Sequence, residues 1–467
     1  MSGDVFGNGL LCSQSVKLVA AFDHRDIFID PDPDPVKSYT ERKRIFDLPR
    51  SSWEDYTKTL ISKGGGIYSR SLKSIKLTPE MKELFGFDEE TDAAAPNELI
   101  RAILKSHVDL LWFGGIGTYV KADSESSADV GDRANEAIRI NGKELNCKVI
   151  GEGGNLGCTQ LGRIEYSLNG GMMNTDAVDN SAGVDCSDNE VNIKILLNSI
   201  VHDGKMTQKQ RDKLLEEMTD DVADLVLRDN YLQTQAISLS KSSSVRQLDS
   251  FVRYLDDLEK TANLDRDLEF LPDDEELDDR EEKSLGLTRP EISVLIAYAK
   301  MSLFDNLMAS DFVNDPYLEK FLFRSFPERL GKKYKNDMRN HQLRSQIIAK
   351  VLCNDIVNRG GIQSIKEETG ASGADIARAA IITSEVFELE NLWDQIEKLD
   401  HVAPATIQLL MLMDVEEFAR RQTIWFLNNT NNDQPIQEII DNYKPGIVEL
   451  FLMNTVAESS SDDGFAN

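Results

Sequence analysis

The sequence predicts a doubly wound, Rossmann-like α/β domain followed by a large all-α domain. Three short apolar runs, residues 16–22, 108–113 and 148–150, each end at a glycine or an aspartate, where a parallel strand commonly gives way to a loop. Helical segments, such as residues 97–105 and 131–140, lie between these runs. Strands that alternate with helices indicate a doubly wound sheet, in which ligands bind outside the carboxyl ends of the strands.

The second part of the chain has a different pattern. From about Asn189 the strand signals end, and apolar residues recur with the period of an α-helix. Residues 288–291 (TRPE) predict a capping box with proline in the first turn of a helix over residues 292–304. One expected helical face carries Leu214, Met218, Val222 and Leu225. Further helices are expected over residues 343–358, 374–387, 405–427 and 436–443.

Two polar stretches interrupt the helical part. Residues 238–244 are rich in serine and lysine, and residues 272–282 form an acidic run that we interpret as a solvated loop or a helix start. We therefore divide the chain into an α/β domain over residues 1–200, whose first strand is missing, a helical domain over residues 201–457, and a flexible tail over residues 458–467.

The charge balance and the distribution of apolar residues exclude several classes of protein. The formal net charge is −29, with 81 Asp and Glu against 52 Lys and Arg, so the chain would repel the phosphate backbone of a nucleic acid. No apolar run reaches the roughly 18–20 residues that span a bilayer, and the first residues do not form a signal peptide. We expect a cytoplasmic protein that binds neither nucleic acid nor membrane.

Neither the cysteines nor the aspartate-proline run predicts a metal site. The five cysteines are scattered, without a CxxC pair or a Cys/His cluster, which suits thiols in a reducing compartment. Residues 30–35 alternate Asp and Pro and predict a stiff extended loop without the glycine-centred geometry of a calcium loop. We expect no metal.

The opening segment has glycines and polar residues that suit a phosphate group. Residues 2–9 (SGDVFGNG) precede a helical-looking stretch over residues 10–15, and the next apolar run ends at Asp23. Glycines at a strand-to-helix turn let the backbone approach a pyrophosphate, and an acidic residue after the following strand can bind ribose hydroxyls and repel a 2′-phosphate. These features predict that NAD rather than NADP is bound, by Gly3, Asp4, Gly7, Asn8 and Asp23. A turn that binds no ligand is the alternative.

A second glycine-rich segment, residues 151–157 (GEGGNLG), follows the third apolar run. In the predicted sheet it lies at the edge where the nicotinamide ring would bind. Gly153 and Gly154 permit close backbone contact with a flat ring, and Asn155 offers both a donor and an acceptor. An ordinary strand-to-helix loop is the alternative.

A third segment, residues 176–190, combines small and polar residues with almost no bulk. This composition suits the floor of a cleft that contacts a polar substrate. A run of this composition is otherwise typical of a surface loop.

The order of these segments resembles the nucleotide-binding half of the glutamate dehydrogenase superfamily. Members have a strand that ends in EGAN and a later run N-A-G-G-V-x-x-S-x-x-E; this chain has EGGN at residues 152–155 and NSAGVDCSDNE at residues 180–190. The KGGGIY segment at residues 63–68 resembles the SKGxIY segment of the superfamily, displaced by an insertion. The SGDVFGNG, AAFDHRDIFIDPDPDP and LTRPEISVLIAYAK segments resemble the large bacterial NAD-dependent glutamate dehydrogenases more closely still, and the resemblance covers nearly the whole chain.

The resemblance implies roles for individual residues. Asn155 would contact the nicotinamide side of NAD, Ser187 would hold the side-chain carboxylate of the substrate, and Asn180 and Gly183 would line the cleft. The implied reaction is the NAD-dependent oxidative deamination of L-glutamate to 2-oxoglutarate and ammonium, in a homo-oligomer. The catalytic lysine and aspartate of the family precede the nucleotide-binding domain, so we assign no catalytic residue to this chain. We expect it to be the C-terminal part of a longer enzyme, with Met1 an internal methionine, and to be inactive alone.

Two other interpretations remain open from the sequence. A branched-chain amino acid dehydrogenase would share the sheet, but Ser187 and the large helical part speak against it, because branched-chain relatives have an apolar residue at that position. A scaffold protein could retain an NAD-binding sheet and a helical assembly domain without chemistry. The absence of a substrate domain from the sequence motivates that interpretation.

Overall fold

The computed structural model describes residues 11, 13–360 and 362–462. The chain divides into two compact units, the first formed by Met1–Ser181 with Thr288–Ser293 and the second by Ala182–Leu287 with Val294–Asn467. The predicted domain boundary at residue 200 falls inside a continuous helix, α8 (Ser181–His202). Among the described residues, no helix combines the length and apolar character needed to cross a membrane.

A three-stranded antiparallel sheet begins the first unit, in the order β1 (Ala20–Phe22), β2 (Asp26–Ile29) and β3 (Gly66–Ser69). The prediction of a parallel strand over residues 16–22 is therefore wrong, because only three residues separate β1 from β2 and a parallel crossover requires a dozen or more. β2 is buried on both faces. Ile27 and Ile29 belong to the main apolar core of the unit, whereas Phe28 packs with Trp53 in a second cluster, as the two-residue period of a strand requires.

The two other apolar runs do form a parallel pair. β6 (Leu110–Phe113) and β9 (Val149–Glu152) run side by side, with Leu110 opposite Val149 and Phe113 opposite Glu152. A short parallel pair, β7 (Val120–Lys121) with β8 (Ile140–Asn141), and an antiparallel pair, β4 (Ile75–Lys76) with β5 (Ala93–Ala94), complete the strands of the described residues. The described strands therefore form four small sheets, and a doubly wound sheet stays a prediction.

Helices of the first unit begin at residues suited to that position. Asp34, Thr78 and Thr159 accept hydrogen bonds from backbone N–H groups in the first turn that follows each of them. Asp34 thus caps a helix at the end of the aspartate-proline run that we expected to be wholly extended. The helices are α2 (Pro35–Phe46), α3 (Pro79–Phe85), α4 (Pro96–Leu104), α5 (Ser127–Val130), α6 (Gln160–Leu168) and α7 (Asp176–Asp179).

Two helix predictions in the first unit need correction, and one is confirmed. The segment 97–105 is helical, as α4. Residues 131–140 instead form a 3₁₀ helix, η3 (Arg133–Ile138), followed by β8; Gly131 has a left-handed φ of 74°, which ends α5 before this segment. The described residues within 10–15 are turns and irregular chain rather than a helix.

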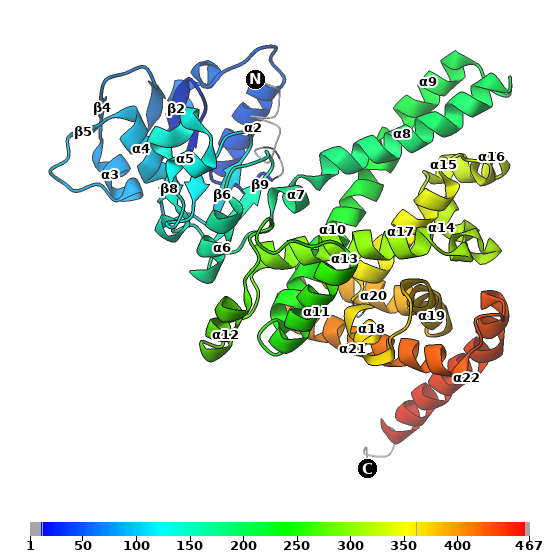
Figure 1. Cartoon of the computed structure of the whole chain (residues 1–467). Helices are drawn as coiled ribbons and strands as arrows, with labels where there is room; N and C mark the ends of the chain where they lie inside the picture. The colour runs from blue at the N-terminus through cyan, green and yellow to red at the C-terminus, as the bar shows by residue number, and fades with distance from the viewer. Residues whose placement is uncertain (1–10, 12, 361, 463–467) are drawn as a thin grey trace. The chain divides into compact units, whose positions relative to one another are not determined.

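The second unit is helical throughout its described residues (Figure 1). Its core joins apolar side chains of α8, α10, α13, α14, α17, α19 and α22. The long helices are α8, α9 (Gln208–Glu217), α10 (Thr219–Ser243), α11 (Leu248–Thr261), α13 (Arg289–Met308), α17 (Arg344–Asn358), α19 (Gly373–Val386), α21 (Ala405–Asn429) and α22 (Ile436–Asp462). Shorter ones are α12 (Asp274–Glu282), α14 (Glu319–Arg324), α15 (Glu328–Gly331), α16 (Lys335–Arg339), α18 (Ile362–Thr369) and α20 (Leu389–Glu397).

Most of the predicted helices of the second part are confirmed. The capping box is present at the start of α13, where the Thr288 N–H donates to Glu291 Oε2 at 2.6 Å. The helical face that we expected across residues 214–225 is divided by the break between α9 and α10 at Met218, which is buried. α22 extends to Asp462, so part of the predicted flexible tail is helical.

The two polar stretches are helical as well. Residues 238–243 lie within α10, where serine hydroxyls donate to carbonyl oxygens one turn earlier, as Ser242 Oγ does to Ser238 O at 2.9 Å. The acidic run forms α12, which begins after Asp273, whose carboxylate accepts from the Glu276 N–H at 2.8 Å. The Asp273 carboxylate thus stabilises the start of α12, whereas the serine bonds within α10 add no stability to that helix.

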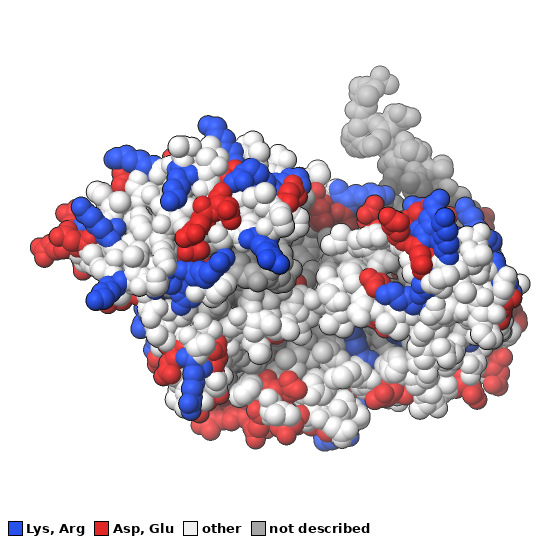
Figure 2. Space-filling view, turned by 90° about the horizontal axis from the view of Figure 1, so that it is seen from above, with Lys and Arg blue, Asp and Glu red and all other residues white. Residues whose placement is uncertain are grey.

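The surface carries charges of both signs. On the face that Figure 2 shows, Lys and Arg side chains are interspersed with Asp and Glu side chains. Exposed ion pairs occur among the described residues, such as that of Lys143 with Asp123 at 2.6 Å. The excess of acidic residues is thus spread among basic ones on this face.

Candidate functional site

The parallel strands β6 and β9 end side by side, and both continue into glycines. Gly114 and Gly115 follow Phe113, while Gly153 and Gly154 follow Glu152. The Gly154 N–H donates to Phe113 O at 2.8 Å, and a Cβ on Gly154 would lie 2.6 Å from the carbonyl carbon of Gly115. The two backbones are thus in direct contact, and only glycine fits at residue 154 without displacing them.

A buried ion pair holds the loop that follows β9. Glu152 is fully buried, and its carboxylate accepts from Arg163 of α6, with Nε to Oε2 at 2.7 Å and Nη2 to Oε1 at 3.0 Å. Burial alone would lower the pKa of Arg163, but its hydrogen bonds to Glu152 raise that pKa, whereas burial outweighs the same bonds at Glu152 and raises the pKa of that carboxyl. The Cys158 N–H also donates to Glu152 Oε1 at 3.1 Å. Glu152 therefore joins the two ends of the 152–158 loop and links them to α6.

Asn155 lies exposed in this loop and contacts the third polar segment. Asn180 Nδ2 donates to Asn155 Oδ1 at 2.6 Å. The next residue, Leu156, has a left-handed φ of 62°, and its N–H donates to Asp176 Oδ2 at 2.8 Å. The structure thus brings together two residues, Asn155 and Asn180, that the sequence placed in separate candidate sites.

Three further residues support this arrangement, and the sequence analysis did not single them out. The Glu152 N–H donates to Asp179 Oδ2 at 3.0 Å, and Asn174 Nδ2 donates to Asp179 Oδ1 at 2.8 Å. Arg289 Nε donates to Asn174 Oδ1 at 3.0 Å. Burial raises the pKa of Asp179 even though these groups donate to it. Asp179 stood within the polar run, but nothing local to Arg289 marked it as part of this network.

Asp23 occupies the turn between β1 and β2. Its Oδ1 accepts from the N–H groups of Arg25 at 2.7 Å and Asp26 at 2.9 Å. Its Oδ2 is buried and has no hydrogen-bond partner among the described residues. One oxygen therefore stabilises the hairpin, while the other remains an acceptor for a hydroxyl donor. The other predicted phosphate-site residues, Gly3, Asp4, Gly7 and Asn8, lie outside the described residues.

Gly183 and Ser187 lie in the second unit, within the first two turns of α8. The alternative of a surface loop for residues 176–190 is thus wrong, because the segment forms α7 and the start of α8. Both residues are exposed, and a Cβ on Gly183 would meet no described atom within 4 Å. Because Ser187 is exposed, its hydroxyl can donate to an anionic group.

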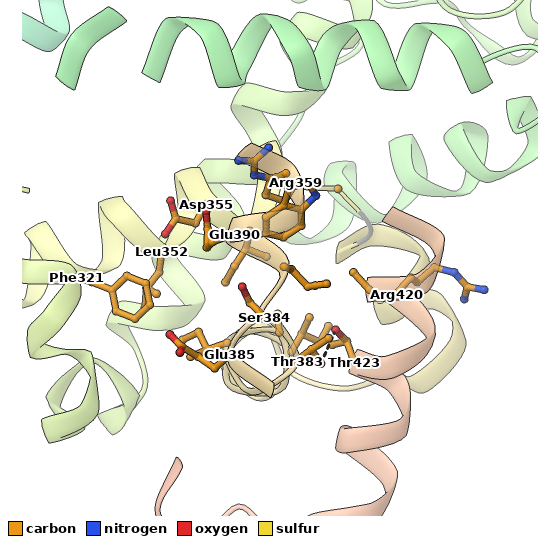
Figure 3. Close-up of a pocket in the computed structure, with 18 of the residues that line it drawn as sticks. Phe321, Leu352, Asp355, Arg359, Thr383, Ser384, Glu385, Glu390, Arg420 and Thr423 are labelled. Atoms are coloured by element: carbon orange, nitrogen blue, oxygen red, sulfur yellow. Dashed lines mark hydrogen bonds between the residues drawn. The ribbon is translucent and has the colours of Figure 1, made fainter. Parts of the chain in front are cut away.

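A separate cavity of about 240 Å³ lies inside the helical unit, between α17, α19, α20 and α21 (Figure 3). Asp355 and Glu390 lie on the same side of it, and burial raises the pKa of both carboxyls. The Arg359 guanidinium stacks over the Trp393 ring, 4.4 Å from its centroid. No sequence signal indicated this cavity, since its lining residues come from six helices, α14 and α18 as well as the four named above.

Comparison with known proteins identifies the class to which this chain belongs. Residues 1–240 match the family model described as bacterial NAD-glutamate dehydrogenase, catalytic domain, and residues 284–462 match that of glutamate dehydrogenase, C-terminal. The chain belongs to the bacterial NAD-glutamate dehydrogenase family, as its motifs predicted.

Curated relatives agree with this assignment. The NAD-specific glutamate dehydrogenase of Halomonas elongata is 50% identical over 453 residues, which cover 96% of this chain and 28% of that protein. The enzymes of the same name from Pseudomonas aeruginosa and Mycobacterium tuberculosis are 51% and 45% identical, over 97% and 92% of this chain. The chain spans 28% of the length of the first two relatives and 27% of the third.

Proposed function

We propose that this chain supplies the NAD-binding and C-terminal helical parts of an enzyme that oxidatively deaminates L-glutamate to 2-oxoglutarate and ammonium. The observation that carries the proposal is the contact between Asn155 and Asn180, which joins the two family motifs in one place. The family membership and the names of the relatives support the substrate and the cofactor. The doubly wound arrangement of the cofactor domain is part of the proposal.

The residues of the first unit fit NAD. Asp23 retains a buried carboxylate oxygen without a partner among the described residues, which suits a ribose hydroxyl, and its charge would repel the 2′-phosphate of NADP. The Gly153–Gly154 backbone and Asn155 would lie against the nicotinamide side, and Gly3, Asp4, Gly7 and Asn8 would contact the pyrophosphate. When bound, NAD accepts the hydride from the substrate Cα.

Residues in the first turns of α8, and Asn180 immediately before it, would select the substrate. The exposed Ser187 hydroxyl would donate to the side-chain carboxylate of glutamate, and an apolar amino acid would leave that hydroxyl unpaired. The resemblance to the family implies that Asn180 and Gly183 would also contact the substrate. We assign no catalytic residue to this chain; the lysine that polarises the substrate carbonyl and the aspartate that transfers protons are expected in the part of the relatives that the chain does not match.

Assembly into a homo-oligomer and a cytoplasmic location also belong to this proposal. Along α21, Ile407, Leu410 and Trp425 are 50%, 57% and 42% exposed, and exposed apolar side chains gathered on one helix are typical of an interface between subunits. Light scattering on the purified full-length protein would give its mass, and a monomer would contradict this part of the proposal.

The proposal is tested by assaying the full-length gene product for reduction of NAD with L-glutamate. We expect formation of NADH with glutamate and far less with L-leucine or with NADP. A preference for leucine would indicate a branched-chain amino acid dehydrogenase instead. Measurable affinity for NAD without turnover of either amino acid would indicate a scaffold protein.

A further inference from the structure

Lys350 of α17 contacts two carboxylates in the first turns of α8. Its Nζ lies 2.9 Å from Asp185 Oδ1 and 2.5 Å from Asp188 Oδ2. Asp185 and Asp188 are three residues apart, so they lie on one face of the helix, and Ser187 stands beside the second of them. The side chains of Asp185 and Lys350 are 15% and 35% exposed. Lys350 therefore binds α8 from a neighbouring helix at the level of Ser187.

A second layer of charges lies near this contact. Asp229 of α10 has its pKa raised to about 6, mainly by burial and then by the nearby Asp185. Burial lowers the pKa of Lys300 of α13 to about 8, and its Nζ donates to Gln233 Oε1 at 2.8 Å. For Lys350, burial lowers the pKa, but the hydrogen bonds to Asp188 and Asp185 outweigh it and raise the pKa. Lys350 is thus the cation of this network that bonds directly to α8.

Apolar packing is uneven along α8. The buried apolar residues of this helix, Ile193, Leu196, Leu197 and Ile200, lie in its second half. In the first ten residues, Ala182 and Cys186 are only partly buried against the core. The start of α8, which carries Gly183 and Ser187, is therefore bound to α17 by the ion pairs to Lys350, with only partial apolar burial beside them.

We propose that Lys350 is a positioning residue for the substrate site: by binding Asp185 and Asp188 it fixes the start of α8 and holds Ser187 where the side-chain carboxylate of the substrate binds. This inference rests on the proposed function, which assigns that carboxylate to Ser187. Lys350 lies in the segment matched by the C-terminal family model and Ser187 in that matched by the catalytic-domain model. The C-terminal region thereby contributes to substrate recognition without contacting the substrate.

Steady-state kinetics of the full-length enzyme test the proposal. Lys350→Met retains the length of the side chain and removes its charge, and we expect KM for L-glutamate to rise about tenfold while KM for NAD stays within about twofold. Lys350→Arg should keep KM for glutamate close to that of the unaltered enzyme. Lys194→Met is the matched control, because Lys194 lies on α8 and forms an exposed pair with Glu190 at 2.8 Å.

Amide hydrogen exchange gives a second readout that does not depend on activity. Backbone amides of residues 181–190 should exchange faster in Lys350→Met than in Lys194→Met, while residues 193–200 remain protected. If Lys350→Met does not fold, Asp188→Ala removes one of the two contacts and should show the same changes to a smaller degree. The proposal is overturned by an unchanged KM for glutamate, by equal changes in both KM values, or by unchanged exchange of residues 181–190. An unaltered enzyme without glutamate turnover would refute the proposed function instead.

Discussion

The side-chain amide of Asn180 donates a hydrogen bond to Asn155 Oδ1 at 2.6 Å. Asn155 lies in the loop after β9, and Asn180 is the last residue before α8. This contact occupies the acceptor of the Asn155 amide and leaves its Nδ2 as a donor for a ligand. The two family motifs thus meet after the parallel strand β9.

The first prediction concerns this pair. We expect Asn155→Ala and Asn180→Ala each to weaken NAD binding. Asn155→Ala removes the side-chain amide that is the proposed donor to NAD, and Asn180→Ala removes the hydrogen bond that orients this amide. In a double-mutant cycle the two losses should be coupled by about 0.5–1.5 kcal/mol. Calorimetric titration of NAD into the unaltered protein, the two single variants and the double variant measures this coupling energy. Asn169→Ala, in which an exposed amide bonded to Glu165 O is lost, should leave NAD affinity unchanged, and strictly additive losses at 155 and 180 would contradict the coupling.

The second prediction concerns the contact between the glycine turns. Gly154→Ala places a Cβ 2.6 Å from the Gly115 backbone, and we expect a loss of about 1–3 kcal/mol in stability together with weaker NAD binding. Gly115→Ala is the control, since a Cβ there meets no described atom within 4 Å. Thermal unfolding gives the melting temperatures of Gly154→Ala and Gly115→Ala, and we expect the first to be lower. Equal melting temperatures would show that the turns separate without cost.

The third prediction concerns the choice between NAD and NADP. Asp23→Asn retains an oxygen that can accept from the Arg25 and Asp26 N–H groups but removes the negative charge that would repel a 2′-phosphate. We expect the ratio of kcat/KM for NAD to that for NADP to fall by about tenfold. Asp32→Asn, which alters an exposed carboxylate paired with Lys17, should not change the ratio. An unchanged ratio in Asp23→Asn would place the ribose elsewhere.

The fourth prediction concerns Glu416 of α21, which lies against the Gly360 backbone. Burial, and then the neighbouring Glu417, raise the pKa of Glu416 from 4.5 to about 7. Between these pH values the folded protein retains a proton that the unfolded chain has lost, so stability falls as pH rises from 4.5 to 7.

Glu416→Gln removes the free-energy cost of ionising a buried carboxyl in the folded protein. We expect it to stabilise the helical unit by up to about 3 kcal/mol at pH 8 and much less at pH 5. Melting temperatures measured at the two pH values check the difference. Glu328→Gln, at an 88% exposed side chain, is the control for replacing a glutamate by a glutamine. A Glu416→Gln variant that is equally stabilised at both pH values would mean that Glu416 titrates normally.

Much of the fold follows from local sequence pattern. The 3.6-residue periodicity predicted α17, α19 and α21 to within two residues, because an amphipathic helix expresses its packing face in consecutive turns. The capping box at Thr288 was likewise readable from four residues. By contrast, the serine-rich end of α10 resembles a linker in composition, and only its burial in the bundle makes it helical.

The sequence by itself determined the family of this protein, the order of its motifs and the identity of most helices, since these depend on residues close together in the chain. The tertiary structure alone decided which side chains meet: Glu152 with Arg163, Asn155 with Asn180, and Lys350 with the start of α8. It also decided that β1 forms a hairpin with β2. Burial, charge pairing and the geometry of elements distant in sequence select these partners. Periodicity and local spacing therefore do not predict them.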